Sequence, residues 1–162
     1  MRSKIAHDIK HRKTPNDDFY TPRELAKKLF KWLNPKGTVL DPAYGTGNFY
    51  FKGNSTKDFY KIKKKYDWLV TNPPYSHLDK WLEHSCKISR KGFAYLLTIH
   101  NLTPRRIEAC ERQGFYITKI YLCKVFKWFG ISAFVVWEIG KKPILEYDRV
   151  VWREPNPPKN KL

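Results

Sequence analysis

Residues 38–49 read TVLDPAYGTGNF, a short apolar run followed at once by an acidic residue and a glycine-rich turn. The apolar run Thr38-Val39-Leu40 is typical of a buried strand, and Gly45 and Gly47 let the backbone turn tightly and approach a ligand closely. In an open α/β sheet, ligands bind beyond the carboxyl ends of the strands. The pattern predicts a ligand site here, although a lone Gly-x-Gly also occurs in plain turns, so both interpretations stay open.

A second apolar run ends in an unusual tetrapeptide: residues 68–75 read WLVTNPPY. Two prolines cannot both serve a central strand, and neither has a backbone N–H, so nearby carbonyls remain free. An amide side chain, a carbonyl and an aromatic ring are thereby fixed within residues 72–75. Such a group can accept two hydrogen bonds from an amino group and stack on a flat ring. The alternative is a plain turn that ends a strand.

Strands alternate with helices in the rest of the chain. Apolar spacing predicts a helix over residues 22–33, with Thr21 as its cap, Pro22 in its first position and Glu24 completing a capping box. We expect a second helix over 76–88, a strand over 93–99 and a helix from 104 that Gly114 closes. Strands at 115–126 and 133–139 are joined by a link too short for a parallel crossover, so they are expected to pair antiparallel.

The predicted fold class is therefore α/β: a doubly wound, mostly parallel sheet with an antiparallel last strand. A length of 162 residues fits one domain, which we place at residues 17–150. Residues 1–16 are predicted to form a flexible basic arm or a solvated tail without a role, and residues 151–162 a polar, proline-rich tail.

Charge and cysteine content narrow the function classes. Lys and Arg number 32 against 15 Asp and Glu, a net charge of +17, which favours phosphate polyanions or an anionic membrane surface as partner. No apolar run is long enough to span a membrane, and no apolar stretch follows the N-terminal residues, so we expect no secretory signal. Three widely spaced cysteines suit reduced thiols in the cytoplasm, or in the host cytoplasm if the chain is viral. His77, His84 and His100 have no metal-ligand spacing, so no metal is expected.

Three motifs in this order resemble those of S-adenosylmethionine-dependent amino-methyltransferases, above all the enzymes that methylate the exocyclic amine of adenine in DNA. Phe19-Tyr20-Thr21-Pro22 resembles the motif at the methionine end of the cofactor. Residues 41–49 resemble the main cofactor loop, and Asn72-Pro73-Pro74-Tyr75 the catalytic tetrapeptide. The resemblance covers about residues 17–140 and implies a Rossmann-like methyltransferase fold, S-adenosylmethionine as cofactor and transfer of its methyl group to adenine N6.

The resemblance also assigns residues. The catalytic residues it implies are Asn72, Pro73, Pro74 and Tyr75, with the Asn72 oxygen and the Pro73 carbonyl accepting the two amine hydrogens and Tyr75 stacking on the base. The cofactor-binding residues it implies are Tyr20, Thr21, Pro22, Asp41, Pro42, Ala43, Gly45, Gly47, Asn48, Phe49, Asp58, Phe59 and Asn72.

The sequence departs from this family between its two main motifs. Only residues 50–71 separate the cofactor loop from the tetrapeptide, too few for the usual two strands and helices, so the fold is expected to be shortened there. The usual ribose-binding carboxylate has no counterpart. Asp58-Phe59 resembles the pair that contacts the cofactor adenine, whereas Asp67 is expected to be structural. Either Asp58 serves both roles or a partner subunit completes the site.

The chain also has no room for a target-recognition domain. Candidate phosphate contacts are the basic arm, the lysine run at 61–65, and Lys124 and Lys127 in the loop after the fourth strand. Aromatic residues at 126, 128 and 129 are either a stacking platform for unpaired bases or packing at the sheet edge. We expect nucleic acid, DNA before RNA, as partner through a basic surface, with a protein partner able to supply target recognition. The alternatives are a non-catalytic or partner-dependent nucleic-acid-binding member of the fold, and a protein glutamine N-methyltransferase.

Overall fold

The computed structural model describes residues 20–43, 45, 47–49, 58–125 and 130–150. Its helices are α2 (Arg23–Leu33), α3 (Leu78–Ile88) and α4 (Pro104–Glu111), and its 3-10 turns are η1 (Phe59–Lys61), η2 (Tyr75–His77) and η3 (Ile99–Asn101). Its strands are β1 (Val39–Leu40), β2 (Tyr66–Thr71), β3 (Ser89–Thr98), β4 (Phe115–Cys123) and β5 (Ser132–Ile139).

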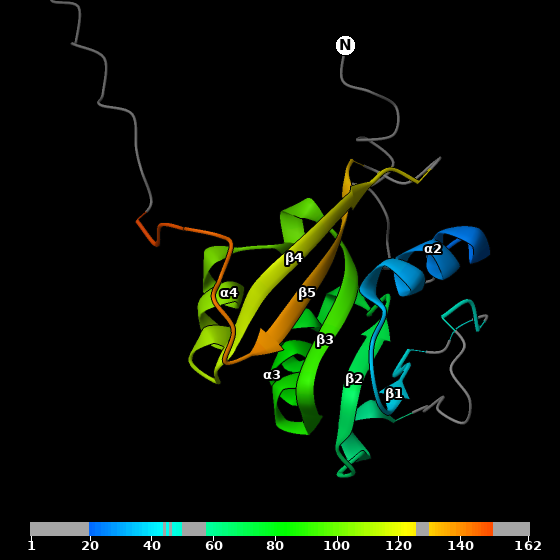
Figure 1. The fold of residues 1–162 in the computed structure, drawn as a ribbon. Coiled ribbons are helices and arrows are strands. Elements are labelled where there is room, and N and C mark those ends of the chain that lie inside the picture. The colour runs from blue at the N-terminus through cyan, green and yellow to red at the C-terminus, as the bar shows by residue number, and fades with distance from the viewer. Residues whose placement is uncertain (1–19, 44, 46, 50–57, 126–129, 151–162) are drawn as a thin grey trace, which may run out of the picture.

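The five strands form one mixed sheet in the order β1-β2-β3-β5-β4 (Figure 1). The pairs β1–β2 and β2–β3 are parallel, while β5 lies antiparallel between β3 and β4. The predicted α/β class, with its antiparallel last strand, is confirmed. Because β4 and β5 are joined by a short connection, they form a hairpin, and β5 enters the sheet beside β3 rather than at its edge.

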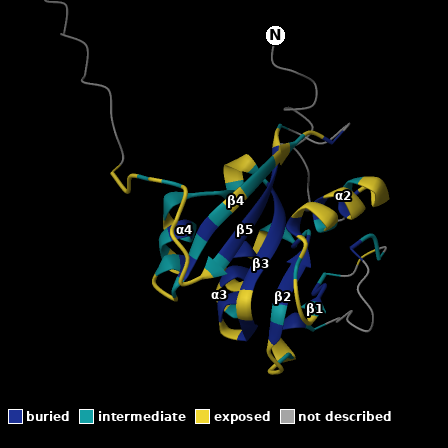
Figure 2. Cartoon of the chain, viewed as in Figure 1, coloured by how far each residue is buried: buried dark blue, intermediate teal, exposed yellow. Residues whose placement is uncertain are grey.

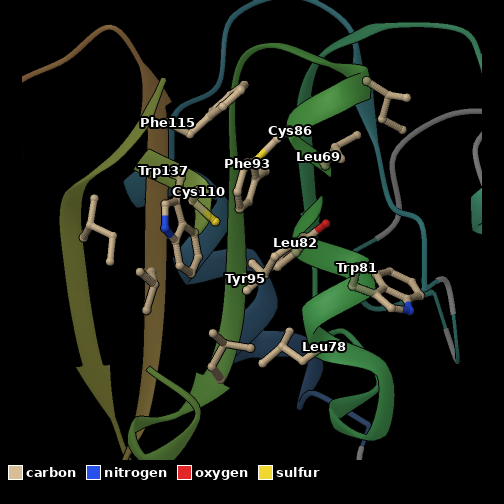
Figure 3. Close-up of a cluster of buried hydrophobic side chains, with 14 of the residues drawn as sticks. Leu69, Leu78, Trp81, Leu82, Cys86, Phe93, Tyr95, Cys110, Phe115 and Trp137 are labelled. Atoms are coloured by element: carbon tan, nitrogen blue, oxygen red, sulfur yellow. The ribbon is translucent and has the colours of Figure 1, made fainter. Parts of the chain in front are cut away.

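Helices cover both faces of the sheet, so the core has two layers. On one face, α3 and α4 pack over a cluster of large side chains that includes Trp81, Phe93, Tyr95 and Trp137 (Figure 3). On the other face, α2 buries Ala26, Leu29 and Leu33 against residues of β2, β3 and β5. Strands β3 and β5 are buried along most of their length because both layers cover them (Figure 2).

The start of α2 differs from the capping arrangement expected for it. The helix begins at Arg23, Pro22 is its N-cap residue, and no side chain caps it. The Thr21 side chain is buried instead of capping, and Glu24 pairs with Lys27 at 2.8 Å. The end of α2 agrees with the prediction, since Asn34 takes a left-handed conformation with φ 48° and stops the helix.

Within the described residues, the η1 turn is the one regular element in the chain between β1 and β2, and β1 pairs with no strand besides β2. This agrees with the expected shortening between the two main motifs. Residues 50–57, the aromatic residues at 126, 128 and 129, Lys127, the arm at 1–16 and the tail at 151–162 lie outside the described residues. Cys86, Cys110 and Cys123 are free thiols. The described helices are all too short or too polar to cross a membrane.

Candidate active site

The two main motifs lie side by side because they follow neighbouring parallel strands. In the β1–β2 pairing, Val39 faces Trp68 and Leu40 faces Leu69. The chain beyond Leu40 therefore runs beside the chain beyond Leu69. Asp41 and Asn72 thus both lie at the carboxyl ends of neighbouring strands, where open α/β folds bind ligands. This juxtaposition is the one that the sequence predicts.

A buried hydrogen bond joins the two motifs. The Thr71 hydroxyl, fully buried on β2, donates to Oδ1 of Asp41 at 2.6 Å. The Ala43 backbone N–H donates to the same oxygen at 3.2 Å. Burial raises the pKa of Asp41 to about 7, while these two hydrogen bonds act in the opposite direction. The carboxyl is therefore held in one place and titrates near neutral pH.

Tyr75 of the tetrapeptide is fixed by a hydrogen bond to the next strand. Its hydroxyl donates to the backbone carbonyl of Leu96 on β3 at 3.3 Å, and its ring packs at the border of the larger core cluster. Pro73 is buried, and Pro74 has the extended conformation, with φ −66° and ψ 125°, before the chain turns into η2. Asn72 and Tyr75 remain partly exposed. The tetrapeptide therefore presents an amide, a carbonyl and a ring from a backbone with little freedom.

The N-terminal motif lies against the glycine-rich loop. The Tyr20 ring lies next to Gly45, since a Cβ placed on Gly45 would be 3.1 Å from a carbon of that ring. The Asn48 side-chain amide donates to the Thr21 carbonyl at 2.5 Å. Gly45 and Gly47 have φ of 52° and 78°, conformations that favour glycine. Three motifs far apart in the sequence thus meet at one place.

Thr21 carries an unsatisfied polar group at this meeting point. Its side-chain oxygen is buried and has no hydrogen-bond partner among the described residues. Buried hydroxyl groups are almost always paired, because an unpaired one costs roughly 1–3 kcal/mol. The Thr21 hydroxyl is therefore available to a polar group that binds beside the glycine-rich loop.

Three residues predicted to bind the cofactor have other surroundings. Phe49 is buried on the α2 side of the sheet and stacks on Phe134 at 6.2 Å between ring centroids. Phe59 is buried on the α3 side and stacks on Trp81 at 4.3 Å. Asp58 forms an ion pair with Lys61 at 2.7 Å. Both phenylalanines contribute to the core, and their contact with a cofactor stays a prediction, as does that of Asp58.

Sequence reasoning missed Thr71, which ties the two motifs together. A signal was present, since a β-branched hydroxyl residue directly precedes the tetrapeptide at the end of an apolar strand. Asp67 was expected to be structural, and it accepts hydrogen bonds from the Thr38 backbone N–H at 2.8 Å and the Thr38 hydroxyl at 3.1 Å. In the described part of the chain, no group of three or more His, Cys, Asp or Glu is placed to hold a metal ion.

A groove of about 500 Å³ lies elsewhere, between α3 and α4. Its walls include Asp79, Arg106 and Cys110, and none of the predicted site residues borders it. Arg106 is held there by Asp79 at 2.6 Å and by the Asn101 carbonyl at 3.0 Å. The groove is therefore separate from the meeting point of the three motifs.

Comparison with known proteins shows the fold. No protein-family model and no curated protein matches the sequence. The chain is similar to the magnesium protoporphyrin IX methyltransferase (ChlM) of Synechocystis PCC 6803 with bound SAM, at a TM-score of 0.58 and 11% identity over 72% of this chain and 79% of that one. It is also similar to a methyltransferase of Pyrococcus furiosus, at a TM-score of 0.55 and 14% identity over 75% of this chain and 84% of that one.

A third similar structure is the Mtq2–Trm112 complex of E. cuniculi, described as responsible for methylation of the translation termination factor eRF1. The TM-score is 0.51, with 17% identity over 76% of this chain and 99% of that chain. All three are described as methyltransferases or as responsible for a methylation, and their identity to this chain is low. This chain therefore has the Rossmann-like methyltransferase fold that was predicted, and the comparisons show the fold alone.

Proposed function

We propose that this chain transfers a methyl group from S-adenosylmethionine to the exocyclic amine of adenine in nucleic acid, with DNA favoured over RNA. The observation that carries the proposal is the buried hydrogen bond of 2.6 Å from Thr71 to Asp41. It couples the glycine-rich loop directly to the strand that ends in Asn72-Pro73-Pro74-Tyr75. A ligand on the loop and an amine at the tetrapeptide would then lie next to each other.

The residues present suit S-adenosylmethionine. The unpartnered Thr21 hydroxyl, the Asp41 carboxyl and the backbone at Gly45 and Gly47 would hold its polar groups. When bound, the cofactor supplies an electrophilic methyl group on a positively charged sulfur. The Tyr20 ring over Gly45 would shield that end of the site from water. Several of the S-adenosylmethionine-binding residues predicted from the sequence thus lie around one loop.

The tetrapeptide would orient the acceptor amine. The Asn72 side-chain oxygen and the Pro73 carbonyl are acceptors, and Pro73 and Pro74 contribute no N–H that competes for them. Two hydrogen bonds from the amine to these oxygens would aim the nitrogen lone pair toward the cofactor loop. Tyr75, whose hydroxyl is tied to Leu96, would stack on the base. Positioning and electrostatics account for the catalysis, and no covalent intermediate on the protein is required.

The charge of the chain favours a nucleic acid over a protein as the methyl acceptor. A net charge of +17 attracts phosphate polyanions and repels basic proteins. In a duplex the target base must leave the stack, which costs a few kcal/mol, and an aromatic ring at the site recovers part of this by stacking. Adenine offers both features that the tetrapeptide suits, an amine with two hydrogens and a flat ring.

The test is transfer of labelled methyl from S-adenosylmethionine to unmethylated DNA and RNA, followed by mass analysis of the digested nucleosides. We expect N6-methyladenine in the DNA. Asn72→Ala should abolish transfer and leave cofactor binding, measured by calorimetry, largely unchanged, because Asn72 contacts the amine. Full activity in Asn72→Ala would exclude the mechanism. Methylcytosine as the product would exclude adenine as the acceptor.

Two alternatives give different results in the same assay. A partner-dependent or non-catalytic protein is suggested by β1, which lies at the edge of the described sheet and leaves one flank of the cofactor loop without a neighbouring strand. That alternative predicts neither transfer nor cofactor binding by the isolated chain. A glutamine methyltransferase would label a protein amide and leave both nucleic acids unlabelled, since an amide also offers two hydrogens to the tetrapeptide.

A further inference from the structure

The end of the sheet opposite the candidate active site carries a concentrated positive charge. Three segments meet there, the turn before β1, the loop before β2 and the first residues of β3. We call this surface the basic pole. Its cationic residues, all exposed, are Lys36, Lys63, Lys64, Lys65, Arg90 and Lys91.

Strand register brings these residues together. Val39 of β1 faces Trp68 of β2, which in turn faces Gly92 of β3. Because the three strands are parallel, the residues a few positions before each of these lie together at the amino ends of the strands. A bulge sharpens the effect: β3 advances by one extra residue between the Tyr66 and Trp68 pairings. Arg90 and Lys91 both lie opposite Asp67 as a result.

Local contacts hold the backbone of the basic pole in place. Lys91 Nζ donates to the Lys36 carbonyl at 2.9 Å, which joins β3 to the turn before β1. Gly37, with φ 110°, lets that turn pass so close to β2 that a Cβ on it would be 2.2 Å from Asp67 Oδ2. The Lys64 ammonium lies 5.4 Å from the centroid of the Tyr66 ring. The surface is thus built on strands and a tight turn.

Asp67 compensates the positive charge of the basic pole only weakly. Asp67 is the carboxylate beside it, and hydrogen bonds from Thr38 already hold the pKa of Asp67 below its usual value. Arg90 and Lys91 approach Asp67 only to 4.0 and 3.8 Å, with about half of each side chain exposed. Exposed pairs at such distances contribute little, so Asp67 offsets only a small part of the charge of Arg90 and Lys91.

We infer that the basic pole is a second contact surface for the phosphate backbone of a nucleic acid, remote from the site where the base would be methylated. This inference rests on the proposed function for its substrate. Residues 65 and 72 are seven positions apart along β2, a distance of about 23 Å at about 3.3 Å per residue. A duplex spans that distance in about 7 base pairs, and a longer path around the surface needs more. A long substrate therefore contacts both ends of the sheet, and a short one only the active site.

Nucleic acid is the occupant that the chemistry of this surface favours. The lysine and arginine side chains of the basic pole can donate hydrogen bonds to the regularly spaced phosphates of a nucleic acid. Anionic membranes are bound most firmly when apolar side chains insert beside the basic ones. None of the large, exposed hydrophobic residues in the described chain comes from the three segments of the basic pole.

The test compares Lys63→Gln/Lys64→Gln/Lys65→Gln with a matched control, Lys27→Gln/Lys80→Gln/Lys142→Gln, which removes three exposed lysines that lie outside the basic pole. Affinity for a DNA duplex of about 40 base pairs is measured over a range of salt concentrations, where each phosphate contact contributes about 0.9 to the slope of log K against log salt. We expect the first variant to lower the slope by about 2 and the affinity at least tenfold, and the control to change both clearly less. Arg90→Gln/Lys91→Gln should act in the same direction as the first variant.

The remaining outcomes separate this inference from the proposed function. Transfer to an acceptor of about 3 nucleotides, with the adenine in the middle, should be the same in wild type and variants, since it is too short to reach the basic pole. Normal transfer together with equal slopes in both triple variants would overturn the inference and leave the function standing. Weaker DNA binding by the first variant, without methyl transfer by any form, would overturn the function alone. Loss of binding to phosphatidylserine vesicles, with DNA affinity unchanged, would identify a membrane contact and overturn the inference.

Discussion

At the scale of single residues, Thr71 determines how the two halves of the candidate site relate to each other. Its hydroxyl donates to the Asp41 carboxyl, which is 1% exposed and, within the described residues, accepts one further hydrogen bond, from the Ala43 N–H. A buried ionised carboxylate is costly unless donors surround it. Burial has the larger effect and raises the pKa of Asp41, while the Thr71 hydroxyl stabilises the charged form of the carboxyl.

We predict that Thr71→Val destabilises the protein by about 1–3 kcal/mol at pH 8, because a methyl group replaces the donor and leaves the carboxylate short of a hydrogen bond. Without that donor the pKa of Asp41 rises further. The loss should be smaller at pH 5, where the carboxyl is protonated. Thr71→Ser keeps the hydroxyl and is the matched control. The free energy of unfolding of wild type and both variants is measured in urea. A Val variant as stable as the Ser variant at pH 8 would contradict the prediction.

Asp41 itself gives a prediction for pH. Burial raises its pKa to about 7 in the folded protein, against about 3.9 in an unfolded chain. Between these values the folded state keeps a proton that the unfolded state loses, so this group lowers the free energy of unfolding as pH rises from about 4 to 7. The full effect amounts to at most about 4 kcal/mol, at 1.36 kcal/mol per pKa unit.

Asp41→Asn cannot ionise and should lack this slope. The difference in unfolding free energy between the variant and the wild type, measured in urea without cofactor, is expected to shift in favour of the variant from pH 5 to pH 8. Ionisable groups elsewhere contribute equally to both proteins and cancel in the difference. A difference that is constant across this range would show that Asp41 titrates normally.

The residue types of the site were predictable to a large extent, and their contacts only in part. Asp41, the two loop glycines and the tetrapeptide stand out because they directly follow two apolar runs in the order of a known family's motifs, and their roles stay predictions. The burial of Phe49 and Phe59 in two opposite core layers was not predictable from their motifs. A phenylalanine in a ligand loop and one in a core look alike until the neighbouring elements are known.

At the scale of elements, apolar spacing was a good guide to helices and a weaker one to their ends. The helix predicted over 22–33 is α2, which begins one residue later, at Arg23, and ends at Leu33, where Asn34 stops it. The predicted cap was wrong because the Thr21 side chain is buried beside the glycine-rich loop, where the Asn48 amide donates to the Thr21 carbonyl. Strand β3 begins at Ser89, before the predicted start at 93, because a bulge lets Arg90 and Lys91 extend it.

Gly92 allows the close pairing of β3 with β5 and gives an element-scale prediction. A Cβ on Gly92 would be 2.3 Å from the Trp137 backbone carbonyl and 2.9 Å from the Trp68 ring. Gly92→Ala should therefore push β5 from β3 and destabilise the protein by more than about 2 kcal/mol. The control is Gly140→Ala, because a Cβ at this position meets nothing within 4 Å. Only the left-handed conformation, with φ 64°, then lowers the stability of this variant, by about 1 kcal/mol. Thermal unfolding compares the two, and equal losses would contradict the packing argument.

At the scale of the whole molecule, the alternation of strands and helices predicted the α/β class and composition predicted the basic charge, but neither predicted where that charge lies. The net charge follows from counting residues, whereas its concentration at one end follows from strand register and a bulge, which only the folded chain displays. Two distant surfaces of different chemistry result. One is the candidate active site, which contains the buried carboxyl of Asp41, and the other is the basic pole, which contains exposed lysines and an arginine.

Charge of this size acts on stability as well as on binding. A folded chain with a net charge of +17 brings like charges closer together than an unfolded chain does, and salt screens their repulsion over about 10 Å at about 0.1 M. We predict that the thermal midpoint rises as sodium chloride increases from about 0.05 to 0.3 M. Lys63→Gln/Lys64→Gln/Lys65→Gln should start from a higher midpoint at low salt and gain less from added salt, because part of the repulsion is already gone. A midpoint that falls with salt, or an equal gain in wild type and variant, would mean that ion pairs such as that of Asp79 with Arg106 outweigh the repulsion.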